Sequence, residues 1–186
     1  MRYWWSNQKL TYSREVGGGY FWCRQRKSNG TKNPFYDAVR LLRAGDVVFA
    51  YCRGRIRAAG LVLSPAEEAP DPARGDRDDA PGTLGWLARV AWLELKNPPR
   101  PMNHFEALKP LLPKNYSPLS PEGRGGQGGR LMPLPQALAM ALAQIAGGMA
   151  EGLPQQAGGT SAPQARGKQL PLAFQTQTEN RKEETP

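Results

Sequence analysis

The stretch GGGYFWCRQRKSNGTKNPFYDAVRLLRAGD, residues 17–46, sets the interpretation of the whole chain. Three glycines lead into the aromatic triplet Tyr20–Trp22, a basic run follows, and Asn33-Pro34 has the form of a helix start. Aromatic rings beside fixed positive charge suit a protein that stacks an unpaired base while its cations hold the phosphates. The alternative is that these rings only pack in the core.

The positive charge lies mainly in the first third of the chain. The 186 residues carry a net charge of +9, and residues 1–60 hold twelve Lys and Arg against three acids. The same segment holds eleven of the sixteen Phe, Trp and Tyr, whereas residues 61–186 are neutral overall. This skew predicts a polyanion partner that is contacted through the first third. A basic surface exposed only to solvent is the alternative.

Length and composition predict one domain and a tail. We expect a folded domain over residues 1–150 and a disordered tail or linker over 151–186, where Gly, Gln, Pro, Ser and Thr dominate. The sequence contains neither a signal peptide nor an apolar run long enough to span a bilayer, which predicts a soluble cytoplasmic chain without membrane contact. Cys23 and Cys52 lack metal-ligand spacing and are expected to be buried thiols.

The hydrophobic pattern predicts an α+β fold. We expect strands at 2–7, 46–53, 56–64, 84–95 and 130–134, and helices at 34–43, 103–110 and 135–150. Residues 8–19 and 65–82 have the composition of loops, and Gly60 suggests a bulge or a barrel bend within its strand. His104, the one histidine, is expected to be a surface residue, and the acids of 65–82 are expected to be solvated.

Several short motifs occur in the order of a known family. They are YWW at 3–5 with Asn7, EVGGGY at 15–20 with Trp22, NPFY at 33–36, GDVVF at 45–49, and LLP with YSPL between 111 and 119. Over residues 1–150 this order resembles the EVE domain, a PUA-like module related to YTH, ASCH and SRA domains. The strongest likeness is to EVE domains fused to HNH nucleases in modification-dependent restriction enzymes.

This resemblance implies a small, twisted, mostly antiparallel β-barrel with flanking helices. It also implies a cleft for a modified base, commonly a 5-modified cytosine such as 5-methylcytosine or 5-hydroxymethylcytosine, flipped out of double-stranded DNA. The implied base-binding residues are Trp22 for stacking, Asn33, Ser6 and Asn7 for the base edge, and Tyr36, Tyr51, Trp5 and Tyr20 as further pocket residues. The candidate phosphate contacts are Arg24, Arg26, Lys27, Lys32, Arg53 and Arg124. A helix N-cap role would explain Asn33 equally well.

We expect neither catalysis nor a bound metal or cofactor. An HNH nuclease needs at least two histidines with metal-binding acids or Asn, and this sequence has one histidine. The chain is therefore expected to act as a stand-alone reader in restriction or phage defence, or beside a nuclease domain or subunit. Three alternatives stay open: a PUA-like RNA-binding module, an amidohydrolase of the ASCH kind using a lysine and an acid, and a protein-interaction module.

Overall fold

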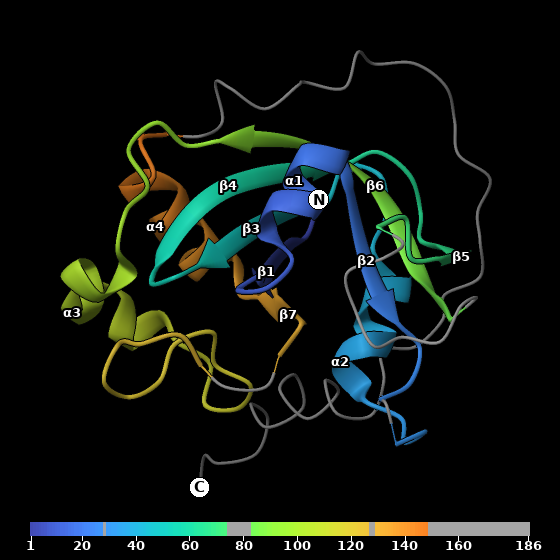
Figure 1. Cartoon of the computed structure of the whole chain (residues 1–186). Coiled ribbons are helices and arrows are strands. Elements are labelled where there is room, and N and C mark those ends of the chain that lie inside the picture. The colour runs from blue at the N-terminus through green and yellow to red at the C-terminus, as the bar shows by residue number, and fades with distance from the viewer. Residues whose placement is uncertain (28, 74–82, 127–128, 149–186) are drawn as a thin grey trace, which may run out of the picture. The chain divides into compact units, whose positions relative to one another are not determined.

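A computed structural model describes residues 1–27, 29–73, 83–126 and 129–148 (Figure 1). The strands are β1 (Tyr3–Asn7), β2 (Tyr20–Arg24), β3 (Val47–Cys52), β4 (Arg55–Val62), β5 (Glu67–Pro70), β6 (Leu84–Glu94) and β7 (Leu131–Leu134). The α-helices are α1 (Tyr12–Gly18), α2 (Pro34–Asp37), α3 (Phe105–Leu108) and α4 (Gln136–Ile145). Short 3-10 helices are η1 (Ala38–Leu41), η2 (Pro101–His104) and η3 (Lys109–Leu111).

The strands form one mixed sheet, in the order β2-β6-β4-β3-β1-β7, with β5 paired to β6. The β1–β3 pair is parallel and every other named pair is antiparallel. The long strand β6 has different partners along its length: residues 85–89 pair with β2 on one side and residues 84–87 with β5 on the other, and residues 90–94 pair with β4. Because one strand changes partners along its length, the sheet curls into a half-barrel. The predicted α+β class, with a twisted and mostly antiparallel sheet, is confirmed.

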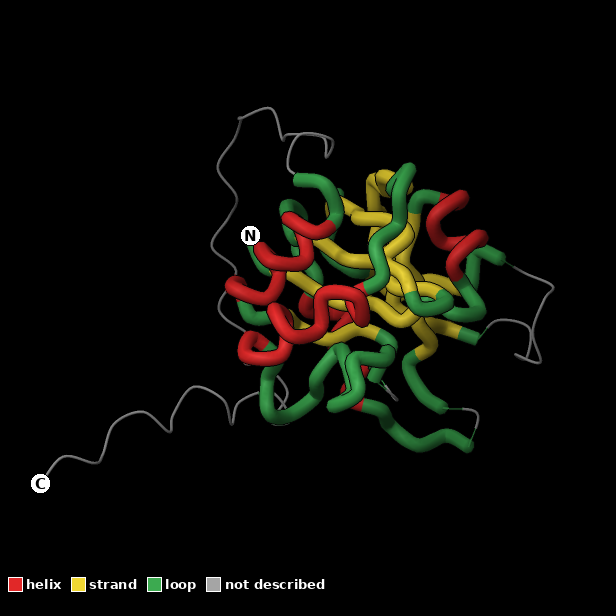
Figure 2. The backbone as a smooth tube through the Cα atoms, turned by 90° about the vertical axis from the view of Figure 1, so that its left-hand side faces the viewer, coloured by secondary structure: helices red, strands yellow, loops and turns green. Residues whose placement is uncertain are grey.

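The strand β1 separates two packed regions. Its Trp5 side faces a core that includes Phe49 of β3 and Leu138 and Leu142 of α4. By strand alternation, Trp4 and Ser6 point to the other, inner side of the curl. Figure 2 shows the strands gathered together with the helical segments lying around them. No described helix is long and apolar enough to cross a bilayer.

The structure contains three elements beyond those expected, two of them in segments predicted to be loops. Residues 12–18 form α1 rather than a loop, although two of its residues are glycines. The helix is held by tertiary contacts of the fully buried Glu15, and Gly19 ends it in the left-handed conformation with φ of 68°. The triplet 20–22 belongs to the strand β2, which lacks the alternating pattern of a half-buried strand because its residues are buried on both faces. The expected loop 65–82 contains β5, an exposed edge strand that tolerates Pro70.

Two local expectations also change. The helix predicted over 34–43 is α2 followed by η1 and ends at Leu41, since Leu42 is already extended. The strand irregularity lies between Ala50 and Tyr51, not at Gly60. Gly60 instead permits close packing: a Cβ there would lie 2.4 Å from Val90 Cγ1. The predicted tail, 151–186, lies outside the described residues.

Candidate functional site

Trp22, the expected stacking ring, lies on the outer side of β2. It pairs with Leu87 of β6 and packs with Tyr20 and Ala69 in a small cluster of its own. Its side chain is 3% exposed, and its indole N–H donates to the carbonyl of Ala69 at 3.1 Å. Tyr20 shares this side of the strand and is buried as well. In this arrangement β5 covers the Trp22 ring, so a base cannot stack on it unless β5 moves.

A buried ion pair occupies the space between β1, α1 and β2. Arg130, the residue just before β7, binds the carboxylate of Glu15 in α1. Its guanidinium also donates to the hydroxyl of Thr11 at 2.7 Å and to the backbone carbonyls of Asn7 and Trp22 at 3.2 and 3.0 Å. Glu15 in turn accepts the backbone N–H of Trp22 at 3.1 Å. One arginine thus ties β1, α1 and β2, which are neighbours in the sequence, to the distant segment that leads into β7.

Phe21 and Cys23 form the apolar wall beside this pair. The Arg130 guanidinium lies over the Phe21 ring, 4.7 Å from its centroid. Burial raises the pKa of Cys23 to about 12, although Arg130 acts in the opposite direction. Burial, the largest single effect, would lower the pKa of Arg130, but the interactions with Glu15 and Cys23 together outweigh it and the pKa is raised. The thiol is therefore neutral and the guanidinium is charged.

Several polar groups beside the ion pair have no hydrogen-bond partner among the described residues. They are the hydroxyl of Ser6, both amide atoms of Gln8 and the second carboxylate oxygen of Glu15. All three side chains are fully buried. Gln8 continues the ladder of β1 through its N–H to the Tyr51 carbonyl at 2.9 Å, so alternation places it on the same side as Ser6. We call Ser6, Gln8, Glu15 and Arg130 the polar cluster.

Two more of the expected residues, Asn7 of β1 and Tyr51 of β3, contact the Gly-rich loop, residues 117–126. The Asn7 side-chain amide donates to the Gly126 carbonyl at 3.0 Å. Tyr51 accepts the Gly125 N–H at 3.1 Å through its hydroxyl, and its ring lies 4.8 Å from that of Trp5. Trp5 is fully buried on the α4 side of the sheet. These contacts fasten the loop to the ends of both strands.

Asn33 caps α2, as its position before Pro34 suggests. Its side-chain oxygen accepts the Phe35 N–H at 3.0 Å, and its carbonyl accepts the Tyr36 N–H at 2.9 Å. A capping role therefore accounts for this residue. Tyr36 is half-buried in the same helix. Their roles at a base stay predictions.

The expected phosphate contacts fall in different places. Arg26, Lys27 and Lys32 are exposed on the segment between β2 and α2, where Arg26 and Lys32 form an isolated bridge. We call residues 26–27 and 29–32 the basic hairpin; it extends from the end of β2 that carries the half-buried Arg24. Arg53 is exposed at the turn between β3 and β4. Arg124 is exposed in the Gly-rich loop.

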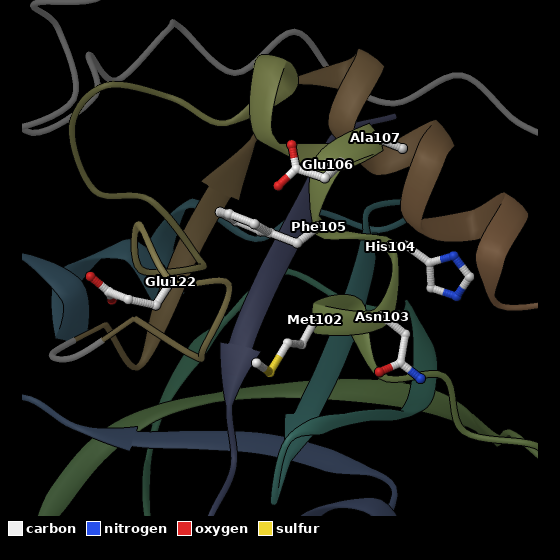
Figure 3. Close-up of a pocket in the computed structure, with 7 residues that line it drawn as sticks. All are labelled: Met102, Asn103, His104, Phe105, Glu106, Ala107 and Glu122. Atoms are coloured by element: carbon white, nitrogen blue, oxygen red, sulfur yellow. The ribbon is translucent and has the colours of Figure 1, made fainter.

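A shallow depression of about 490 Å³ lies at η2 and α3 (Figure 3), and no residue of the polar cluster lines it. Its lining is Met102, Asn103, His104, Phe105, Glu106, Ala107 and Glu122. These seven residues include two glutamates and no Lys or Arg. Phosphate binding is therefore disfavoured there, and none of the expected site residues lines it.

Sequence reasoning missed Gln8, Glu15 and Arg130 as site residues. Glu15 and Arg130 are 115 positions apart, so their pairing leaves no local pattern. One signal was available: Glu15 is one of only three acids in the basic first third, within a segment predicted to be a loop. A lone acid within a strongly basic segment is a candidate for pairing with a distant arginine.

No protein-family model and no curated protein sequence matches this chain. Solved structures do match. The Pho92 YTH domain in complex with m6A has 14% identity and a TM-score of 0.50, covering 78% of this chain and 85% of that one. A Pseudomonas putida protein has 14% identity and a TM-score of 0.50, covering 77% and 99%.

Human THYN1 in complex with 5-methylcytosine-containing DNA matches at 14% identity with a TM-score of 0.48, covering 79% of this chain and 98% of that one. At these identities the matches describe the fold. The chain has the PUA-like fold, in which a curled, mostly antiparallel sheet is flanked by helices.

Proposed function

We propose that this chain is a non-catalytic reader of modified nucleic acid. In this proposal, 5-methylcytosine or 5-hydroxymethylcytosine is flipped out of double-stranded DNA and bound on the inner side of the curled sheet. The base contacts the polar cluster, and the basic hairpin holds the phosphates. Flipping costs a few kcal/mol, which stacking, base-edge hydrogen bonds and phosphate contacts repay.

The unpartnered groups of the polar cluster are the observation that carries this proposal. Buried polar groups are nearly always hydrogen-bonded, and each one left unpaired costs roughly 1–3 kcal/mol. The Gln8 amide offers two donors and an acceptor, and the free oxygen of Glu15 accepts. A cytosine edge carries one amino donor and two acceptors. The donors and acceptors of Gln8 and Glu15 are therefore complementary to those of cytosine.

The charge distribution and the fold support the same proposal. The excess positive charge lies in the first 60 residues, which contribute β1, α1, β2 and the basic hairpin. A neighbour in fold, the Pho92 YTH domain, binds m6A. In the restriction or phage-defence role that the motif resemblance suggests, the chain would supply recognition in the cytoplasm. A nuclease domain or subunit would supply cleavage.

A binding titration tests the proposal. Three duplexes of one sequence carry cytosine, 5-methylcytosine or 5-hydroxymethylcytosine at a single position. The wild-type protein should bind one of the modified duplexes at least tenfold more tightly than the unmodified one. Equal affinity for all three duplexes would leave the basic third as a non-specific electrostatic surface and reject the proposal.

Gln8→Leu provides the sharpest variant, and Gln144→Leu, on the exposed side of α4, provides its control. Removing an unpartnered buried amide should keep or raise the free energy of unfolding while it abolishes the preference for the modified base. A purely structural glutamine would give the reverse result, a less stable protein with its preference retained. Gln144→Leu should change neither property.

A modified-RNA reader is the second candidate, favoured by the likeness to a YTH domain in complex with m6A. The same titration therefore includes single-stranded RNA with and without m6A. Tighter binding of the modified RNA than of any duplex would assign the site to RNA.

A further inference from the structure

Trp86 lies on the inner side of β6, opposite to the side that Trp22 occupies on β2. The strand register sets this: Trp86 pairs with Cys23, whereas Trp22 pairs with Leu87. Paired residues of neighbouring strands share a side of the sheet. Cys23 also interacts with Arg130, so Trp86 is one strand away from the polar cluster. Unlike Trp22, Trp86 is only half-buried.

The Trp86 ring has an exposed cation over its face. The guanidinium carbon of Arg40, from η1, lies 4.7 Å from the ring centroid. The Arg40 side chain is exposed, so it can leave the ring without uncovering a core. A planar guanidinium on an indole occupies the same position that a stacked base would take.

Two further features beside Trp86 suit a base. Its indole N–H is shielded from solvent and has no partner among the described residues. Glu68, which pairs with Trp86 across β5 and β6, is exposed and accepts a hydrogen bond from Gln25. A carboxylate is the usual acceptor for the exocyclic amino group of cytosine.

We propose that Trp86 is the stacking platform for the modified base and that Arg40 covers this ring until the base arrives. This inference rests on the proposed function and names its aromatic contact, with cytosine as the class of base. Trp22 cannot serve while β5 covers it and while its N–H is bonded to Ala69. The basic hairpin leaves β2 at the end where Cys23 faces Trp86, which brings phosphate-binding groups near the ring.

Trp86→Ala, Trp86→Phe and Trp22→Phe test the assignment on the cytosine and 5-methylcytosine duplexes. Loss of one base–aromatic stack should weaken binding of the modified duplex by roughly 5- to 150-fold in Trp86→Ala. In Trp86→Phe the affinity for the modified duplex should fall only a few-fold, because an aromatic ring remains. Trp22→Phe should bind as the wild type does, and thermal unfolding of each variant checks that it is folded.

Tryptophan fluorescence gives a readout that a merely structural ring would not change. The modified duplex should quench part of the wild-type emission, and Trp86→Phe should lose that quenching while Trp22→Phe keeps it. If Trp22→Phe loses both preference and quenching while Trp86→Phe retains them, the platform is Trp22 and this inference is wrong. If the wild type shows no preference for the modified duplex, the proposed function itself fails.

Discussion

Cys23 is the residue where burial has its clearest chemical consequence. The thiol is 4% exposed in the wall beside Arg130, and its pKa rises from 9.0 to about 12. Burial removes the water that a thiolate needs, and the nearby Arg130 charge only partly replaces it. The folded protein therefore keeps this proton at a pH where the unfolded chain releases it.

The free energy of unfolding should consequently fall in alkali because of Cys23. Its contribution is fully present below pH 9 and is lost as the pH rises from 9 towards 12, since only the unfolded chain ionises in that interval. Between pH 8 and pH 10.5 the wild type should lose about 2 kcal/mol more than Cys23→Ala, at about 1.4 kcal/mol per pH unit.

Urea unfolding of both proteins at the two pH values measures this difference. Cys52→Ala is the matched control, because it removes the other buried thiol and keeps Cys23. Equal losses in the wild type and in Cys23→Ala would show that the Cys23 thiolate is tolerated in the folded protein.

The Gly-rich loop depends on close backbone approach to β3. A Cβ at Gly125 would lie 2.4 Å from Tyr51 Cε1, and the N–H of the same glycine donates to the Tyr51 hydroxyl. Gly17 in α1 is the opposite case, since a Cβ there would meet nothing within 4 Å. Both glycines lie in segments of similar composition, yet only one is required by packing.

Gly125→Ala should therefore destabilise the fold by roughly 1–3 kcal/mol, through overpacking against Tyr51 and loss of its hydrogen bond. Gly17→Ala should stabilise it by roughly 0.5–1 kcal/mol, because alanine favours the helix and loses less backbone entropy. Thermal unfolding of the two variants compares them directly. A stable Gly125→Ala protein would mean that the loop does not pack on Tyr51 in solution.

The predictable part of the fold was the part with a strong local pattern. β3, β4 and β6 follow from apolar runs bounded by turn residues, and they appear close to the expected positions. α1 could not be predicted this way, because glycines oppose helix formation and only the distant partner Arg130 of Glu15 explains it. Local propensity contains no information about a contact 115 residues away.

The site was predicted less completely than the fold, for a geometric reason. The sequence indicates aromatic rings near basic residues, but the side of the sheet on which a ring lies depends on strand register. Trp22 and Trp86 lie on adjacent strands, and a shift of one residue in their pairing would place both rings on the same side of the sheet. The polar cluster likewise joins β1, α1 and β7, which only the tertiary structure brings together.

Charge is distributed unevenly over the whole chain, and this should control binding to any nucleic acid. Each phosphate that a Lys or Arg neutralises releases a condensed counterion, so affinity falls with salt at a slope of about 0.9 per contact on duplex DNA. The basic hairpin carries Lys27 and Lys32, both exposed, close to the strand that bears Cys23. Lys96 and Lys114 are also exposed but belong to the neutral remainder of the chain.

The double variant Lys27→Gln/Lys32→Gln should lower the slope of log K against log salt by about 1.8, while Lys96→Gln/Lys114→Gln should leave it unchanged. Titrations of the modified duplex at four salt concentrations give both slopes. If the slope of log K against log salt falls by the same amount in both double variants, binding depends on net charge alone and the hairpin has no special role. If only the hairpin variant loses slope and the preference for the modified base survives, then the phosphate contacts and the base contacts are separate parts of one interface.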